Sequence, residues 1–247
     1  MVQDGSVFRR VEKKYLITQE QAYGLWARIG SYMLPDPFGP STLCSGYLDT
    51  PSFQLIRQSM ENTAFKEKLR LRSYGLPGPE DKVFFEIKRK CRGVVYKRRQ
   101  AMSLSQAQAC LEEQKTPQHS QILQEIGYFF SRYGPLRPAL TLFYQRRAFD
   151  GAGEPGLRLT FDTGVRYTLC PLWDCQDTQG QLILGEDRVL MEIKTLGAMP
   201  LWLSHSLDAC RIYPSKFSKY GTAYGQACQK GELFYAGSVL ERISTRP

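Results

Sequence analysis

Basic side chains occupy alternate positions in several short segments of the sequence. In the segment 64–73, Lys68, Arg70 and Arg72 alternate with other residues, mainly leucines, so in a β-strand the three cations would share one face. Lysine ammonium groups and arginine guanidinium groups bind phosphate oxygens, and arginine does so with two donors at once. This spacing therefore indicates a surface that binds a phosphate-rich anion.

The same alternation recurs in four other segments, and each of them includes an acid. The aligned sets are Arg10, Glu12 and Lys14; Glu86, Lys88 and Lys90; Arg158, Thr160 and Asp162; and Glu192 and Lys194. Strand parity in the segment 94–102 adds Lys97 and Arg99 as further phosphate contacts. Carboxylates among such cations would hold a divalent metal ion through their oxygens.

The overall charge agrees with an anionic partner but does not identify it. Lysine and arginine total 33 against 24 acids, which gives a formal net charge of +9. Nucleic acid, an acidic membrane surface and a phosphorylated metabolite would all suit this excess, so the placement of the charges has to decide. The seven cysteines contain no C-x-x-C pair and the two histidines lack a neighbouring ligand, which disfavours a structural zinc site.

Alternation with a period of two predicts strands, and longer segments that begin with a hydroxyl cap predict helices. We expect strands at residues 8–16, 45–49, 64–73, 83–90, 94–102, 139–149, 157–162 and 188–194. We expect helices at residues 18–29, 103–113, 120–132, 201–210 and 221–230. No long linker or low-complexity tract divides the chain, which favours a single domain over residues 1–247.

These elements predict an α+β fold, an antiparallel β-barrel of about eight strands with helices packed around it. Two arrangements are possible. The apolar strand faces could fill the interior of the barrel, or they could pack outward against the helices while the charged faces line a tunnel. Like charges on neighbouring strands repel each other unless an anion neutralises them, so a bound anion favours the second arrangement.

An ordered set of motifs runs through these segments. The motifs are Arg10-Val-Glu-Lys-Lys-Tyr, Tyr47-Leu-Asp-Thr, Lys68-Leu-Arg-Leu-Arg-Ser-Tyr-Gly, Phe85-Glu-Ile-Lys-Arg-Lys, Tyr96-Lys-Arg-Arg, Tyr144-Gln-Arg-Arg-Ala-Phe, Arg158-Leu-Thr-Phe-Asp, Glu192-Ile-Lys and Phe217-Ser-Lys-Tyr. The set resembles the VTC domain, the catalytic domain of the vacuolar transporter chaperone polyphosphate polymerases, which belong to the triphosphate tunnel metalloenzymes. The resemblance spans roughly residues 7–226.

The resemblance implies a tunnel in which the γ-phosphate of ATP is transferred onto a growing inorganic polyphosphate chain, with Mn²⁺ or Mg²⁺ as cofactor. The catalytic phosphate ligands that it implies are Lys14, Arg70, Arg72, Lys88, Arg146, Arg158 and Lys219, and the metal ligand is Glu192. The aligned strand faces add Arg10, Lys68, Lys90, Lys97 and Arg99 as phosphate contacts, and Glu12 and Glu86 as metal ligands.

Four functions remain in competition: a polyphosphate polymerase, a metal-dependent triphosphatase on the same barrel, a non-catalytic polyphosphate-binding protein and a nucleic-acid-binding protein. The related hydrolases usually begin with Glu-x-Glu-x-Lys, whereas this chain begins with Arg10-x-Glu12-x-Lys14, which favours the polymerase. Nucleic-acid binding is the least favoured, because acids and threonine, rather than exposed aromatic residues, accompany the basic side chains.

The N-terminal residues lack the basic-then-apolar order of a signal peptide, and no apolar run approaches the ~18–20 residues that span a bilayer. We therefore expect a cytoplasmic protein without a membrane span of its own. The eukaryotic assemblies that contain this domain also include a membrane channel, so a separate membrane partner is possible.

Overall fold

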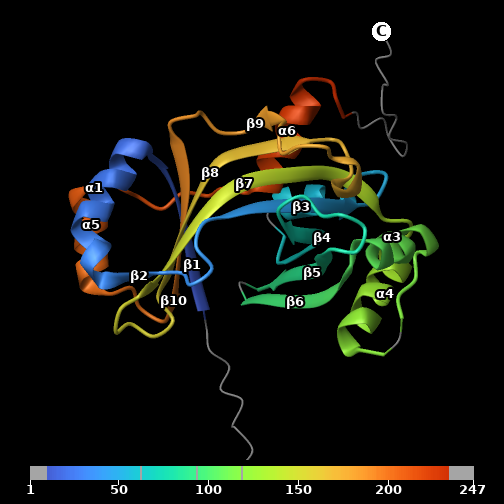
Figure 1. Ribbon diagram of the computed structural model, residues 1–247, viewed down its shortest axis with the longest axis horizontal. Helices are drawn as coiled ribbons and strands as arrows, with labels where there is room; N and C mark the ends of the chain where they lie inside the picture. Colours follow the sequence, from blue (N-terminus) through green and yellow to red (C-terminus); the bar gives the residue numbers. More distant parts are fainter. Residues whose placement is uncertain (1–9, 62, 93, 118, 234–247) are drawn as a thin grey trace, which may run out of the picture. The chain divides into compact units, whose positions relative to one another are not determined.

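The computed structural model describes residues 10–61, 63–92, 94–117 and 119–233, and of Arg10 only the backbone. Within these residues it contains ten β-strands in one sheet and six α-helices (Figure 1). The strands are β1 (Arg10–Thr18), β2 (Met33–Pro35), β3 (Ser41–Asp49), β4 (Phe65–Tyr74), β5 (Lys82–Cys91), β6 (Val94–Ser103), β7 (Arg137–Gly151), β8 (Arg158–Thr168), β9 (Gln181–Leu182) and β10 (Arg188–Leu196). The helices are α1 (Gln19–Ile29), α2 (Gln54–Met60), α3 (Leu104–Glu113), α4 (Gln121–Tyr133), α5 (Leu201–Ala209) and α6 (Lys219–Gln229).

Eight strands follow one another in the hydrogen-bonded order β1-β10-β8-β7-β3-β4-β5-β6. The short strands β2 and β9 pair with β7 and β8 beside this order. Among the described residues this order does not close into a ring, because β1 and β6 are its two ends. The predicted α+β class and antiparallel sheet are confirmed, and the eight strands of the main order correspond to the number expected.

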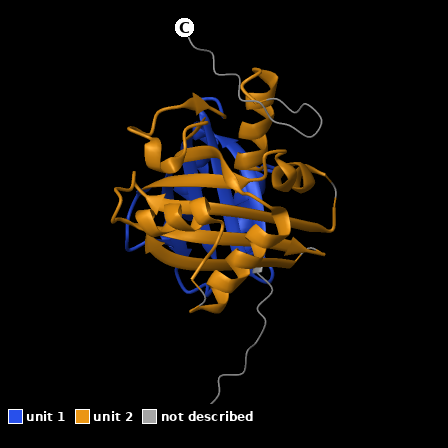
Figure 2. Cartoon of the chain, turned by 90° about the vertical axis from the view of Figure 1, so that its right-hand side faces the viewer, with its two compact units in different colours: residues 1–41, 145–164, 184–217 blue, residues 42–144, 165–183, 218–247 orange. Residues whose placement is uncertain are grey.

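The chain divides into two compact units, which Figure 2 shows in blue and orange. Unit 1 comprises Met1–Ser41, Gln145–Gly164 and Leu184–Phe217, and unit 2 comprises Thr42–Tyr144, Val165–Ile183 and Ser218–Pro247. Each unit is thus assembled from three separate segments, and β7 and β8 contribute residues to both. The single domain over 1–247 stays a prediction.

Local sequence determines where several of these elements begin and end. Helices α1 and α3 start with capping boxes, in which Thr18 and Ser103 each exchange hydrogen bonds with the glutamine three residues later. Strand β7 ends at Gly151, and Gly153 and Gly156 adopt the positive φ angles that the turn to β8 requires. The two caps lie at the predicted starts of these helices, and the turn lies between the strands predicted at residues 139–149 and 157–162.

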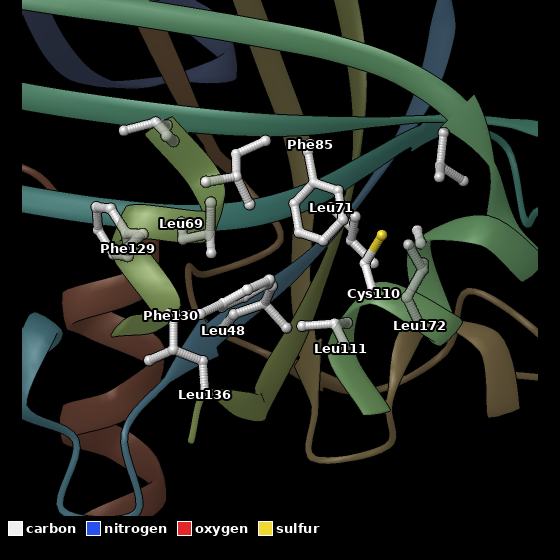
Figure 3. Close-up of a cluster of buried hydrophobic side chains, with 14 of the residues drawn as sticks. Leu48, Leu69, Leu71, Phe85, Cys110, Leu111, Phe129, Phe130, Leu136 and Leu172 are labelled. Atoms are coloured by element: carbon white, nitrogen blue, oxygen red, sulfur yellow. The ribbon is translucent and has the colours of Figure 1, made fainter. Parts of the chain in front are cut away.

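In unit 2 the apolar face of the sheet packs against helices α3 and α4. Leu69 and Leu71 of β4 and Phe85 of β5 are buried in one cluster with residues of both helices (Figure 3). The rings of Phe85 and Phe130, the latter from α4, lie 6.4 Å apart between centroids in an edge-to-face arrangement. Burial of each such side chain contributes about 1.5–3 kcal/mol, so this layer holds α3 and α4 on the sheet.

Unit 1 repeats this design with helices α1 and α5. Its buried cluster contains Tyr15 and Ile17 of β1, Leu159 of β8, Met191 and Ile193 of β10, Leu25 and Ile29 of α1, and Leu203 and Leu207 of α5. In both units the apolar strand faces therefore pack against helices, and the aligned charged residues lie on the opposite face. The second predicted arrangement places the apolar strand faces against helices, and this placement is confirmed within each unit.

Helix α2 and the short strands β2 and β9 are elements that the sequence did not reveal. The seven-residue α2 has no cap from its own N-cap residue, Phe53. Instead, the buried carboxylate of Asp49, at the end of β3, accepts hydrogen bonds from the backbone N–H groups of Leu55 and Ile56 at 2.8 and 3.0 Å. The last residue of β3 thus caps the N-terminus of helix α2. None of the helices in the described part of the chain has both the length and the hydrophobicity to span a bilayer.

Candidate functional site

Strands β4, β5 and β6 place charged residues in rows across the sheet of unit 2. In the pairing register Arg70 lies opposite Glu86, and Glu86 lies opposite Arg99. The neighbouring row consists of Lys68, Lys88 and Lys97. Directly opposed residues share a face of the sheet, so the parity predicted for these six side chains is confirmed.

Glu86 lies at the centre of a group of four cations, which we call the Glu86 cluster: Arg70, Arg72, Glu86, Lys97 and Arg99. Arg70 donates two hydrogen bonds to Glu86 Oε2, at 2.7 and 2.9 Å. Lys97 Nζ and Arg99 Nε lie 2.8 and 3.2 Å from Oε1, and Arg72 Nε lies 3.8 Å from Oε2. Only 1% of Glu86 is exposed, so one buried carboxylate faces four positively charged side chains.

This environment changes the acidity of Glu86. Burial alone would raise the pKa of Glu86, but the charges of Arg70, Arg72 and Lys97 outweigh it and lower the pKa from 4.5 to about 2. Desolvation lowers the pKa of Lys97 to about 8, because the attraction of Glu86 offsets burial and the two arginines only in part. The cluster therefore carries an excess of positive charge that a bound anion could neutralise.

Two tyrosines that the sequence did not single out hold the arginines of the Glu86 cluster. The hydroxyl of Tyr47 accepts a hydrogen bond from Arg70 Nη1 at 3.0 Å, and the hydroxyl of Tyr144 accepts one from Arg72 Nη2 at 3.1 Å. Tyr47 lies opposite Arg70 in the register of β3 and β4. Both tyrosines begin motifs of the sequence, but a phenol is common in cores, so motif position alone could not distinguish their roles.

The N-terminus of α6 brings Lys219 and Ser218 to this part of unit 2. Lys68 Nζ donates to the hydroxyl of Ser218 at 3.1 Å, and Ser218 also caps α6 by accepting from the N–H of Gly221. Lys219 is buried, with its ammonium group 4.6 Å from the ring centroid of Tyr144. Lys68 and Lys219, predicted as phosphate contacts, thus come from elements that touch each other.

Lys88 and Lys90 are exposed on β5, on the same face as Glu86. Lys88 lies between Lys68 on β4 and Lys97 on β6. Lys90 lies two residues further along β5, opposite Lys66. Their predicted role in phosphate binding stays a prediction. The side chain of Arg10, another predicted contact, lies outside the described part of the chain.

Unit 1 contains a second charged group, which we call the Glu192 cluster: Glu12, Lys14, Arg146, Asp162, Glu192 and Lys194. In the pairing of β1 with β10, Lys14 lies opposite Glu192 and Glu12 lies opposite Lys194. Lys14 Nζ is 3.7 Å from Glu192 and 3.8 Å from Glu12, and it donates to the carbonyl of Phe217 at 3.1 Å. Lys194 Nζ and Arg146 Nη2 each lie 3.8 Å from Glu192 Oε2.

Arg146 and Arg158, both predicted to bind phosphate, have different surroundings. Arg146 forms a two-pronged ion pair with the buried Asp162, at 2.6 and 2.7 Å, and so joins the Glu192 cluster. Arg158 instead donates to Asp150 at 2.8 and 2.9 Å and to Asp36. Phosphate binding by Arg158 stays a prediction, and it would require the ligand to compete with two aspartates.

The carboxylates of unit 1 can be compared with what a metal ion needs. No group of three or more histidine, cysteine, aspartate or glutamate side chains within the described residues is arranged to hold a metal ion. Glu12 and Glu192, however, both approach Lys14. Mg²⁺ is commonly bound by only one or two carboxylates together with substrate phosphates and water, so these two residues fit a metal ion that arrives with a phosphate ligand. Glu86, surrounded by cations, is the less favoured ligand, and its metal role stays a prediction.

Comparison with known families gives one match of high coverage. The model of the VTC domain matches residues 9–228, almost the whole of the described chain. No curated protein matches the sequence.

Two solved structures share the fold. A candidate adenylate cyclase from Bacillus halodurans has a TM-score of 0.52 and 16% sequence identity, with coverage of 85% of this chain and 95% of that one. A candidate adenylyl cyclase from Hippeastrum, described as having a dominant triphosphatase activity, has a TM-score of 0.50 and 14% identity, with coverage of 88% and 96%. At such low identity these likenesses concern the fold alone.

Proposed function

Because the chain belongs to the VTC domain family, we propose that it is a polyphosphate polymerase that transfers the γ-phosphate of ATP onto a growing inorganic polyphosphate chain. ATP and polyphosphate are the proposed partners, and the proposed location is the cytoplasm.

The Glu86 cluster carries the proposal. Four cations surround one carboxylate, and the rows of β4, β5 and β6 extend the cationic face to Lys68 and Lys88. A linear polyphosphate has about one negative charge per phosphate, so it can contact several such cations at once. A single carboxylate or a neutral ligand would leave most of these charges unbalanced.

The residues of the two clusters suit phosphoryl transfer, which depends on positioning and charge neutralisation more than on a protein nucleophile. We infer that Arg70, Arg72 and Arg99 bind and orient phosphate oxygens. Within unit 1, Glu192 and Glu12 would hold Mn²⁺ or Mg²⁺, which when bound supplies charge neutralisation to the phosphate groups that it accompanies.

A metal-dependent triphosphatase is the second candidate. The Hippeastrum protein, which shares the fold, is described as having a dominant triphosphatase activity. Arg10, where related hydrolases usually have a glutamate, argues against this alternative because it replaces a metal-binding carboxylate by a cation.

One incubation distinguishes the candidates. The purified chain is incubated with ATP and either Mn²⁺ or Mg²⁺, and the products are separated on a gel that resolves phosphate polymers, while free phosphate is measured in parallel. A polymerase yields polymer and ADP, whereas a triphosphatase yields free phosphate without polymer. Binding of polyphosphate without turnover of ATP would overturn both enzymatic proposals and leave a binding protein.

A further inference from the structure

Tyr47 is in contact with both the Glu86 cluster and helix α6. Its hydroxyl accepts a hydrogen bond from Arg70, which at the same time donates two hydrogen bonds to Glu86. Its ring stacks on that of Tyr220, with centroids 4.3 Å apart and an angle of 22° between the planes. Tyr220 in turn donates to the buried carboxylate of Asp49 at 2.8 Å. The Tyr47 ring is therefore fixed between β4 and α6, and only 7% of the residue is exposed.

The hydrogen-bond geometry leaves the Tyr47 hydroxyl with a donor function. A neutral phenol has one proton and two acceptor positions, and Arg70 occupies an acceptor position. Its proton can therefore be donated to an oxygen of a phosphate bound to Arg70. An ionised Tyr47 loses this donor and adds a negative charge beside the same guanidinium group.

The charges around Tyr47 come from several elements. Strand β4 contributes Lys68, Arg70 and Arg72, and Glu86 on β5 reaches Tyr47 through Arg70. Helix α6 contributes Tyr220, and β7 contributes Tyr144, which interacts electrostatically with Arg70. Burial alone would raise the pKa of Tyr47, but the three cations of β4 and the hydrogen bond from Arg70 outweigh it and lower the pKa to about 8.

We propose that Tyr47 is a proton-linked positioning residue of the phosphate site: neutral, it orients Arg70 and donates to the bound phosphate, and ionised, it competes with the phosphate for Arg70. This inference rests on the proposed function of the Glu86 cluster as the phosphate-binding site. It adds a residue and a form of regulation that the cationic pattern of the sequence does not contain.

The coupling between phosphate binding and protonation of Tyr47 determines how the affinity changes with pH. If phosphate binds only the neutral form, binding raises the pKa of Tyr47, and the protein takes up a proton when it binds at a pH above about 8. The affinity for phosphate then falls as the pH rises through this range, by at most about tenfold per pH unit for this one group. Below pH 7 the phenol is neutral with or without ligand, and no such proton uptake occurs.

Lys97 titrates in the same pH range and has to be separated from Tyr47. Its loss of charge as the pH rises would also weaken anion binding, since burial lowers its pKa to about 8. Lys97→Arg keeps the positive charge and removes this titration, because arginine stays protonated throughout the range. The protonation of the phosphate ligand itself is the same for every variant and cancels in a comparison between them.

The experiment uses inorganic tripolyphosphate without metal, binding to the whole chain, and the ultraviolet absorbance of tyrosinate. Wild type, Tyr47→Phe and Lys97→Arg are titrated from pH 6.5 to 9.5 with and without ligand, and affinities are measured by calorimetry over the same range. We expect a tyrosinate signal near pH 8 in wild type and in Lys97→Arg that tripolyphosphate suppresses. In Tyr47→Phe this signal should be absent. The affinity of Tyr47→Phe for tripolyphosphate should also fall less steeply with pH than that of wild type, by a factor of up to about ten per pH unit.

Each outcome has a distinct meaning. Binding of tripolyphosphate to wild type at pH 9 without suppression of tyrosinate would overturn the role of Tyr47 and leave the phosphate site intact. This result is obtained with wild type alone, so it does not depend on whether a variant folds. An unchanged tyrosinate signal in a folded Tyr47→Phe would overturn it as well. Absence of tripolyphosphate binding at every pH, although tyrosinate still forms near pH 8, would instead overturn the proposed phosphate site and with it the linkage.

Discussion

Neighbouring arginines on β6 have opposite surroundings. Arg99 Nε lies 3.2 Å from Glu86, and its guanidinium group lies 3.5 Å from the ring centroid of Phe84. Arg98, on the other face of the strand, lies 3.5 Å from Glu125 on α4. The same chemical change at these two adjacent positions therefore tests whether one face of the sheet binds phosphate.

We predict that Arg99→Gln weakens the binding of tripolyphosphate, while Arg98→Gln leaves it nearly unchanged. Loss of one charged hydrogen bond to a phosphate typically costs about 1.5–3 kcal/mol, which corresponds to roughly 10- to 100-fold in affinity. Calorimetric titration of both variants at one salt concentration measures the difference. Equal weakening by the two variants would indicate an effect of net charge and would contradict a site on the Glu86 face.

We predict that Glu192→Gln abolishes metal-dependent turnover of ATP but keeps part of the binding of tripolyphosphate measured without metal. The substitution removes the charge of a metal ligand and leaves the cations Lys14, Arg146 and Lys194 in place. Turnover with Mn²⁺ and metal-free binding are measured on the same preparation. Wild-type activity of Glu192→Gln would exclude Glu192 from the metal site.

Elements differ in how clearly the sequence predicts them. Alternation gives seven of the eight strands of the main order within four residues at each end, whereas β8 continues six residues beyond its predicted end. The signal is clear in β1, β4, β5 and β10, because these strands have one apolar face packed against helices and one charged face. Capping boxes likewise give the starts of α1 and α3. Helix α2 is missed because its first N–H groups are satisfied by Asp49 through tertiary contact, for which a local pattern has no signal.

The candidate site is predictable where strand parity or the family motifs govern it. Parity identifies Glu86 and the cations of β4, β5 and β6, since opposed residues of paired strands share a face. The motifs add Arg146 and Lys219. It does not identify Tyr47, which depends on the pairing of β3 with β4 and on the stacking of α6. Nor does it show that Arg158 is held by Asp36 and Asp150, because Asp36 lies outside the regular strands.

The helical layer of unit 2 supports the sheet that presents the Glu86 cluster. We predict that Phe129→Ala on α4 lowers the free energy of unfolding by about 3–5 kcal/mol, because Phe129 is fully buried and its removal leaves a cavity. Tyr128→Ala, at the neighbouring position, removes a ring that is 58% exposed and should cost far less. Denaturant unfolding of both variants measures the difference, and equal costs would contradict the packing of α4 on this sheet.

At the scale of the whole molecule, the depressed pKa of Glu86 links stability to acid. A carboxyl whose pKa falls on folding contributes stability above its unfolded pKa, here 4.5, and this contribution is lost as the pH falls towards 2. For this one group, the free energy of unfolding changes by at most about 1.4 kcal/mol per pH unit.

We therefore predict that wild type loses stability between pH 4.5 and about 2 more steeply than Glu86→Gln, which has no proton to gain at this position. Thermal unfolding across the acid range measures both curves. Glu125→Gln is the control, because Glu125 also contacts two arginines but lies on α4. Parallel curves for wild type and Glu86→Gln would show that Arg70, Arg72 and Lys97 do not depress the pKa of Glu86.

Strand β1 has β10 as its neighbour in the sheet order, with Lys14 opposite Glu192, about 180 positions later in the chain. A ribosome that adds roughly 5–20 residues per second needs on the order of ten seconds or more to complete that interval. During this time the buried residues Tyr15 and Ile17 of the nascent chain have no partner strand. We expect β1 to be the part of the newly synthesised chain that most needs a chaperone, until the synthesis of β10 lets it pair.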